Sequence, residues 1–457
     1  MSVEPLVTFV VPCYKLAHML SECVNSILKQ DYENFEVLIM DNCSPDRTPE
    51  VAQSFNDPRI QHIRNESNLG HIRNYNKGMT LARGKYVWLL SADDMLRSPH
   101  VLGRFVDVME RNPRVGYVFC RAVELHQGKE KEIVRWADCG DEDCIWNDTS
   151  FLMRLIQTNC IVAPTVLMRK AGHDKVGLFQ PDLPFASDWY MWCMLAMQYD
   201  VAYLSDPMVC YRVHEESLTT LYSRDYARIC VGDELTVLWR VGREAELANI
   251  LSLRGACEAA FLRRAVDLLR AGLQGVTLSI SVAEFEEILQ SRIGDVEGAK
   301  EIRASVYTRL TESVTTLLFR DIPPIALADD LGALWSMGHQ AKLAGIPSLR
   351  EACEAAFFRG AVHLLSAGLQ GATPCLSATE FETILQTRIG NLEDVKHIRA
   401  IVYTSLGDRQ YCAGEYGQAA QSYWLGLTAC PWRMKTWTKY LLLRTGGVGI
   451  RIRQLSH

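Results

Sequence analysis

Two adjacent carboxylates follow a strongly apolar segment of the chain. Residues 85–94 read KYVWLLSADD, so that Asp93 and Asp94 come just after the apolar run Tyr86–Leu90. A run of this kind predicts a strand covered on both faces, and ligands gather at the carboxyl ends of such strands. A hard divalent cation that also binds phosphate oxygens would relieve the repulsion between the two carboxylates. The alternative is that they cap a helix beginning at Ser98–Pro99.

Strands and helices that could position these carboxylates alternate over the first half of the chain. We expect strands at residues 7–11, 35–40, 60–63, 86–90 and 115–119, and helices at residues 20–28, 72–82 and 101–110, with another helix capped by Thr48. This alternation predicts βαβ units and a mainly parallel sheet. Polar groups follow the first four strands: Pro12-Cys13-Tyr14, Asp41-Asn42, Asn68-Leu69-Gly70 and Asp93-Asp94. Their clustering after strand ends favours a nucleotide site at one edge of the sheet.

In this order, the motifs resemble those of family 2 glycosyltransferases, which are inverting enzymes that use nucleotide-sugar donors. The resemblance extends from about Val7 to about Thr220. PCY at 12–14 is similar to the opening turn of the family, DNCSPD at 41–46 to its "DDGSTD" segment, and residues 68–94 to its long signature through the metal-binding aspartates. The resemblance implies an α/β GT-A nucleotide-diphospho-sugar transferase fold with a mainly parallel central sheet.

The same resemblance assigns roles to the residues after the strands. It implies that Asp41 and Asn42 contact the base, that Arg73 lies near the nucleotide, and that Asp93 and Asp94 bind ribose, metal and diphosphate. The remaining donor-binding residues are expected to be Pro12, Tyr14, Asn68 and Gly70. Two positions depart from the family pattern: Asn42 stands where a second aspartate is frequent, and Ser91 replaces the first acid of the D-x-D triplet.

Two later segments also resemble family motifs. ASDWYMWCMLA at 186–196 is similar to an acidic helix start and implies that Asp188 is the general base, with Ser187 where a glutamate is usual. YRVHEESLT at 211–219 implies that His214 joins Asp93 in holding a divalent metal, Mn²⁺ or Mg²⁺. The alternatives are that Asp188 is an ordinary residue of a helix N-terminus and that His214 is a surface histidine.

The composition is that of a globular protein with more than one domain. The chain has 457 residues, of which 48% are hydrophobic and 22% charged. Its net charge of −6 argues against nucleic acid as a partner. No signal peptide or apolar run of membrane-spanning length is evident, so we expect a cytoplasmic protein. Arg444, Arg451 and Arg453 would give weak attraction to anionic lipid, which suits peripheral contact with the inner face of a membrane.

The second half of the chain contains an internal duplication. SLRGACEAAFLRRAVDLLRAGLQG begins at Ser252 and SLREACEAAFFRGAVHLLSAGLQG at Ser348, an ungapped offset of 96 positions (348 − 252). The composition predicts stacked helical units that could serve self-association or acceptor docking. Tyr411–Pro431 resembles a tetratricopeptide-type hairpin. We therefore expect a transferase domain at 1–225, repeats at 226–325 and 326–406, and a hairpin with its tail at 407–457.

Together these features predict an inverting glycosyltransferase that moves a sugar, from a UDP-sugar in our expectation, to an acceptor hydroxyl. The acceptor would be a glycan, a lipid-linked oligosaccharide or a protein in bacterial-type surface glycan synthesis. The alternative is a partner-binding repeat protein whose degenerate transferase domain senses nucleotide sugar, which Ser91 and Ser187 would suit. A sugar nucleotidylyltransferase would need a glycine-rich basic loop after the first strand, and PCYKLAH at 12–18 is not such a loop.

Overall fold

The computed structural model divides the chain into two compact units, Met1–Arg263 and Arg264–His457. The expected domain boundary at residue 225 therefore falls inside the first unit. The basic residues Arg444, Arg451 and Arg453 lie outside the described part of the chain. The structure describes residues 6–273, 282–293, 302, 305–307, 309, 335, 338, 339, 347–369, 377–386, 392–431, 435, 436 and 438–440.

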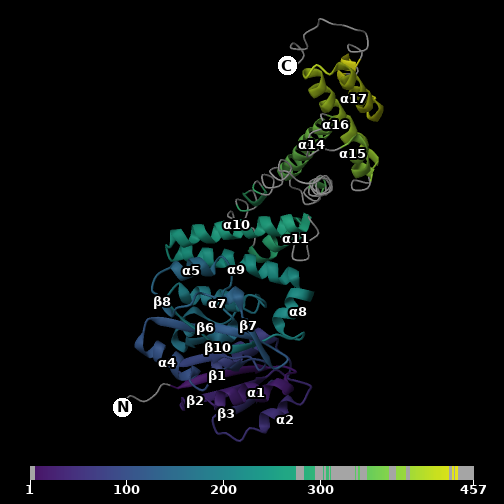
Figure 1. Cartoon of the computed structure of the whole chain (residues 1–457). Coiled ribbons are helices and arrows are strands. Elements are labelled where there is room, and N and C mark those ends of the chain that lie inside the picture. Colours follow the sequence, from purple (N-terminus) through teal and green to yellow (C-terminus); the bar gives the residue numbers. More distant parts are fainter. Residues whose placement is uncertain are drawn as a thin grey trace. The chain divides into compact units, whose positions relative to one another are not determined.

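One sheet forms the centre of the first unit (Figure 1). In the described residues it has ten strands, with the order β3-β2-β1-β4-β9-β6-β10-β5, while β7 pairs with β6 and β8 with β10. The strands are β1 Val7–Cys13, β2 Phe35–Asp41, β3 Ile60–Arg64, β4 Tyr86–Leu89, β5 Met95–Leu96, β6 Val115–His126, β7 Lys129–Ile133, β8 Cys144–Trp146, β9 Val166–Arg169 and β10 Asp200–Arg212.

The strands that carry the expected site residues run in the same direction. β1 pairs in parallel with β2 and β4, β2 with β3, and β6 with β10. Because β9 is antiparallel to both β4 and β6, it joins these two parallel groups without reversing their common direction. The expected mainly parallel sheet is confirmed. The carboxyl ends of β1, β2, β4 and β10 consequently meet at one edge, where a ligand can bind.

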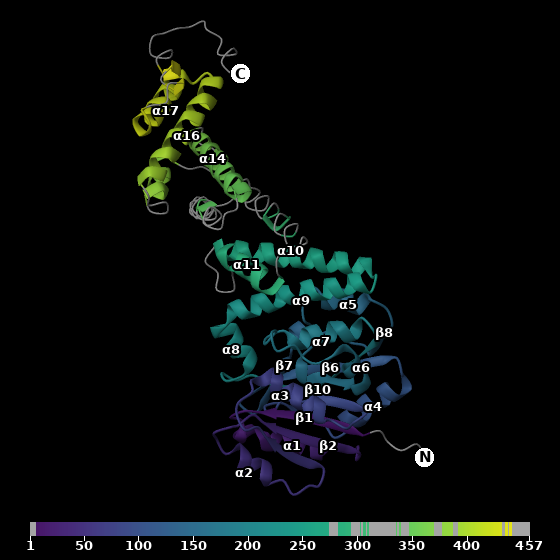
Figure 2. The same cartoon turned by 180° about the vertical axis from the view of Figure 1, so that it is seen from behind.

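Helices cover both faces of the sheet in the first unit. α7 packs against β6, and α9 packs in turn against α7 (Figure 2). The helices are α1 Ala17–Leu28, α2 Thr48–Gln53, α3 His71–Leu81, α4 Val101–Arg111, α5 Ser150–Leu155, α6 Lys170–Val176, α7 Ser187–Ala196, α8 Leu218–Asp225, α9 Ala227–Leu247 and α10 Leu251–Leu273. None of the described helices is long and apolar enough to cross a membrane.

Two expected helix starts differ from the structure. Asp93 and Asp94 do not cap a helix at Ser98–Pro99, because β5 intervenes and α4 begins at Val101. Thr48 is the first residue of α2 instead of its N-cap, because Asp46 Oδ1 accepts a hydrogen bond from the Thr48 backbone N–H at 3.1 Å. A side chain that precedes the helix thus satisfies the first free N–H group.

The second unit is helical in its described residues. α11 is Val282–Ile288, α14 Pro347–Leu369, α15 Ala378–Ile384, α16 Leu392–Cys412 and α17 Tyr416–Ala429. The hairpin expected at Tyr411–Pro431 corresponds to the end of α16, a turn at Gly414 and α17, and the ring of Tyr423 packs against Gly407.

Equivalent contacts recur in the duplicated sequences. The rings of Phe285 and Tyr307 meet at 6.0 Å and 81°, and those of Phe381 and Tyr403 at 6.0 Å and 82°. Both tyrosine hydroxyls donate to a glutamate, Glu286 in one copy and Glu382 in the other. Both α10 and α11 have the same lengths as their counterparts α14 and α15. These contacts support the expected duplication.

Gly78 allows α3 to approach the sheet closely. A Cβ added at Gly78 would lie 2.4 Å from Val10 Cγ1 and 3.1 Å from Met40 Cγ. Val10 and Met40 are both fully buried, so neither can move aside easily. Helix α3 carries residues to the edge of the sheet at which the strands end. This close packing therefore sets the distance between α3 and the sheet, and it also stabilises the core.

We expect Gly78→Ala to destabilise the first unit by about 1–3 kcal/mol, because the added methyl overpacks the contact between α3 and β1. The matched control is Gly103→Ala in α4, where the added Cβ would have only an ordinary contact at 3.7 Å with Asp31 Oδ1. Alanine favours a helix over glycine, so this control should gain about 0.5–1 kcal/mol. Differential scanning calorimetry measures both, and equal melting temperatures for the two variants would contradict the packing argument.

Candidate active site

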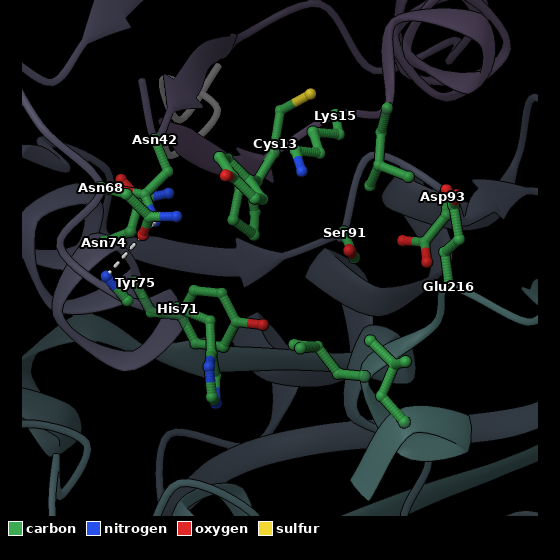
Figure 3. A pocket seen from close by; sticks show the side chains of 16 residues that line it. Cys13, Lys15, Asn42, Asn68, His71, Asn74, Tyr75, Ser91, Asp93 and Glu216 are labelled. Carbon is green, nitrogen blue, oxygen red and sulfur yellow. Dashed lines mark hydrogen bonds between the residues drawn. The ribbon is translucent and has the colours of Figure 1, made fainter. Parts of the chain in front are cut away.

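A pocket of about 450 Å³ lies at the carboxyl ends of the parallel strands (Figure 3). Six residues expected to bind the donor line it: Pro12, Tyr14, Asn42, Asn68, Gly70 and Asp93. The other lining residues are Cys13, Lys15, Leu16, His71, Asn74, Tyr75, Ser91, Glu216, Leu218 and Leu221. The structure therefore brings segments from β1 to the region after β10 together around one cavity.

Amide side chains form one side of this pocket, as Figure 3 shows for Asn42, Asn68 and Asn74. Asn42 Nδ2 donates to Asn68 Oδ1 at 2.8 Å, and Asn42 Oδ1 accepts from Asn65 Nδ2 at 3.0 Å. Asn65 Nδ2 also donates to Asn74 Oδ1 at 2.8 Å. Such a connected network holds each amide in one orientation, which suits it to select hydrogen-bonding groups of a ligand. Asn65 was not predicted, since it belongs to none of the family motifs.

Asp41 lies behind the pocket and is fully buried. Its carboxylate accepts hydrogen bonds from the Ser44 backbone N–H at 2.8 Å and from Arg64 Nη1 at 2.6 Å. These bonds support the turn after β2, in which Cys43 has a positive φ of 61°. Arg73 is exposed on α3 and is not among the lining residues, whereas His71, Asn74 and Tyr75 on the same helix are. The roles expected for Asp41 and Arg73 toward the nucleotide stay predictions.

Asp93 lines the other side of the pocket, where it meets His214, which is not itself a lining residue. His214 Nε2 lies 3.0 Å from Asp93 Oδ2, although the two residues are 121 positions apart. Within the described structure, Asp93 Oδ1 is buried without a hydrogen-bond partner. Adjacent ligands of an octahedral ion at about 2.1 Å lie about 3 Å apart, and a buried orphan oxygen is available as a further ligand atom. The two side chains could therefore supply ligand atoms to a divalent cation, but the described residues contain no group of three or more His, Cys, Asp or Glu side chains that would hold one.

Asp94 points away from the pocket and ties two strand ends together. Its Oδ1 accepts a hydrogen bond from the Arg212 backbone N–H at 2.9 Å. Arg212 Nε donates to the Asp93 carbonyl oxygen at 2.7 Å, and Arg212 Nη2 to Glu22 Oε2 at 2.5 Å. Burial, and then the charge of Asp93, raise the pKa of Asp94 well above its usual value. Asp94 and Arg212 thus hold the end of β10, and with it His214, next to the turn after β4.

Asp188 lies in the first turn of α7, outside the residues that line the pocket. Desolvation raises its pKa to about 6, while hydrogen bonds from the Trp189 backbone and the Asn159 side chain oppose this rise. Burial raises the pKa of Tyr75, and the charges of Asp93 and Asp188 raise it further. Tyr75, which lines the pocket, therefore lies within electrostatic reach of both carboxylates.

Glu216, Lys15 and His71 are among the ten lining residues that were not predicted as site residues. Glu216 lies on the same side of the pocket as Asp93 in Figure 3. Its position in the segment YRVHEESLT, two residues after His214, could have indicated that it belongs to the site. Lys15 has a positive φ of 60°, and its backbone N–H donates to Ser44 Oγ at 3.2 Å. His71 Nε2 lies 2.7 Å from the Pro184 carbonyl oxygen. No local pattern announces the last two, because their position depends on contacts with distant loops.

Comparisons with known proteins agree with this geometry. The sequence model of the family described as Glycosyl transferase family 2 matches residues 8–177. An uncharacterized glycosyltransferase of Haemophilus influenzae is 27% identical over 259 residues, which are 54% of this chain and 79% of that protein. The putative teichuronic acid biosynthesis glycosyltransferase TuaG of Bacillus subtilis is 32% identical over 111 residues, 24% of this chain and 44% of that protein.

A solved structure shows the same fold. The crystal structure of S. aureus TarS 1-349 aligns with a TM-score of 0.50 and 18% identity, over 76% of this chain and 91% of that chain. Residues 8–177 thus match the family 2 glycosyltransferases, and the expected resemblance and the α/β fold class are confirmed. The chain is a glycosyltransferase followed by a helical region.

We expect Arg212→Ala to weaken UDP binding in the presence of Mn²⁺ by about 10-fold, because the end of β10 would lose its side-chain bonds to the Asp93 carbonyl and to Glu22. Isothermal titration calorimetry measures this loss. The control is Arg111→Ala, which removes an exposed arginine that pairs with Asp107 on α4. Wild-type affinity in Arg212→Ala would show that the tie between the strand ends does not support the site.

Proposed function

We propose that this glycosyltransferase binds a nucleotide-diphosphate sugar, a UDP-sugar in our expectation, and transfers the sugar to an acceptor hydroxyl with inversion. The observation that carries the proposal is the contact of His214 with Asp93, a carboxylate that lines a pocket whose other side consists of hydrogen-bonded amides. The amides would bind the polar edges of the base and ribose. The carboxylate and imidazole would lie toward the diphosphate.

Asp93 and His214 are the residues that would hold a divalent metal, Mn²⁺ or Mg²⁺. When bound, the metal offsets the negative charge of the leaving nucleotide diphosphate. Asp93 can supply its orphan Oδ1 as well as Oδ2, and His214 can supply Nε2. Ser91 ligates only weakly in the position of the missing acid, and Glu216, a carboxylate that lines the same pocket, is placed to compensate for it.

Asp188 is the proposed general base. Inversion in one step requires a carboxylate to take the proton of the acceptor hydroxyl while the nucleotide diphosphate leaves. A pKa of about 6 leaves Asp188 deprotonated at neutral pH and makes it more basic than an exposed aspartate. Glu216 is the competing candidate, because it lines the pocket and Asp188 does not.

The acceptor that we propose is a bacterial surface glycan under synthesis. The support is the name of the Bacillus subtilis relative, which refers to teichuronic acid biosynthesis. A lipid-linked oligosaccharide and a protein are the other acceptor classes that a hydroxyl-directed transferase could use. The duplicated helical region would serve acceptor docking or self-association, since stacked helical units offer extended surfaces.

Asp93→Ala should abolish the part of UDP binding that depends on a divalent metal, because it removes two potential ligand atoms and leaves His214 alone. Titration calorimetry with Mn²⁺ and with a chelator measures this difference. Asp107→Ala, which removes an exposed carboxylate of α4, should leave it unchanged. If the wild-type protein binds UDP equally well with and without chelator, the metal proposal is wrong.

Asp188→Asn should lower kcat by roughly 10² or more and leave donor affinity intact, because the amide keeps the shape but cannot accept the proton. Wild-type kcat should also decline as the pH falls below about 6, where Asp188 becomes protonated. The assay is nucleotide diphosphate release from a panel of UDP-sugars. A near-normal kcat in Asp188→Asn together with an inactive Glu216→Gln would move the role of base to Glu216.

A further inference from the structure

A buried carboxylate on α9 holds the backbone that leads into the helix of Asp188. Asp233 is fully buried, and its Oδ2 accepts hydrogen bonds from the Phe185 backbone N–H at 2.7 Å and the Ala186 backbone N–H at 3.3 Å. Ala186 is the N-cap residue of α7, so Asp188 follows two positions later. Loss of this acceptor would leave the two backbone N–H groups without their hydrogen-bond partner.

The same loop is held from the side of the pocket. The Pro184 carbonyl oxygen lies 2.7 Å from Nε2 of His71, which lines the pocket. The Phe185 ring packs against Tyr222 of α8 with centroids 5.9 Å apart, and Tyr222 also packs against His71 at 5.9 Å. Groups from α3, α8 and α9 therefore fix three consecutive residues immediately before α7.

We propose that Asp233 is a positioning residue for transfer, which fixes the loop 184–186 so that the first turn of α7 presents Asp188 to the acceptor hydroxyl. The inference rests on the proposed function, because it requires Asp188 to be the base. A misplacement of about 1 Å in a reacting group costs on the order of 10²-fold in rate. The catalytic part of the chain then extends at least to Asp233, beyond the residues that match the family and beyond the boundary expected at 225.

The duplication supplies a matched control. Asp233 and Asp329 are equivalent positions of the two copies, in GDELTVLW at 232–239 and ADDLGALW at 328–335. Asp329 belongs to the second unit and lies outside the described residues. If Asp233 acts through the loop before α7, removal of the equivalent carboxylate in the other copy should not change transfer.

The experiment compares full-length Asp233→Ala, Asp233→Asn and Asp329→Ala with the wild-type chain. The substrate is whichever of UDP-glucose, UDP-galactose and UDP-N-acetylglucosamine the wild-type chain turns over. We expect Asp233→Ala to lose about 10- to 100-fold in kcat with a donor KM within about twofold of wild type. Asp233→Asn should recover most of the loss, because its amide oxygen can accept the same bonds, and Asp329→Ala should match wild type.

Hydrogen–deuterium exchange gives a second readout that needs no substrate. The amides of Phe185 and Ala186 donate to Asp233, so they should exchange faster in Asp233→Ala and remain protected in Asp329→Ala. If Asp233→Ala does not fold, Asp233→Ser replaces it under the same criteria, since its hydroxyl can still accept one of the two bonds. Unchanged exchange of both amides would overturn the inference.

Kinetic measurements can also contradict the positioning role of Asp233. A wild-type kcat in Asp233→Ala would contradict it even if the melting temperature fell, because Asp233 would then contribute only to stability. A loss caused by a raised donor KM would assign Asp233 to the donor pocket instead. Asp188→Asn, measured in parallel, separates the two proposals. A fully active Asp188→Asn would contradict the assignment of Asp188 as the base. An inactive Asp188→Asn together with a fully active Asp233→Ala would reject only the positioning role of Asp233.

Discussion

The candidate site depends on a hydrogen-bonded tie between two strand ends that are distant in sequence. Asp94 accepts from the backbone of Arg212, and Arg212 returns a side-chain bond to the carbonyl of Asp93. The tie brings the end of β10 to the turn after β4 and sets His214 against Asp93. Both Asp94 and Arg212 are buried. Removal of the Asp94 side chain would leave the backbone N–H of Arg212 without its acceptor, and removal of the Arg212 side chain would take a donor from the Asp93 carbonyl. Either change would lower the stability of the fold. Every role proposed for the cation site follows from this constraint.

The proposed site includes residues beyond the part of the chain that matches the family. The match ends at residue 177, whereas Asp188, His214 and Glu216 all follow it. They arrive through two packing contacts: α7 lies on β6, and β10 pairs in parallel with β6. Helix α9 then packs on α7 and contributes Asp233. The helices after the sheet are therefore part of the transferase unit.

The internal duplication relates helices of the first unit to helices of the second unit in sequence. A Cβ added at Gly242 of α9 would lie 3.2 Å from Cys257 Cβ, and one added at the equivalent Gly338 would lie 3.3 Å from Cys353 Cβ. The close approach of this glycine to this cysteine therefore recurs in both copies, in agreement with the duplication.

Five of the strands, β1 to β4 and the start of β6, could be predicted from the sequence, as could the mainly parallel sheet and lining residues next to strand ends, such as Pro12, Asn42 and Asn68. This was possible because apolar runs and turn residues act over a few positions, and parallel strands bring their carboxyl ends to one edge. The sequence contained no signal that Asp41 would bond Arg64, that Arg73 would lie outside the residues lining the pocket, or that Asp233 would reach the loop before α7. These partners are set by long-range packing, which neither periodicity nor spacing encodes.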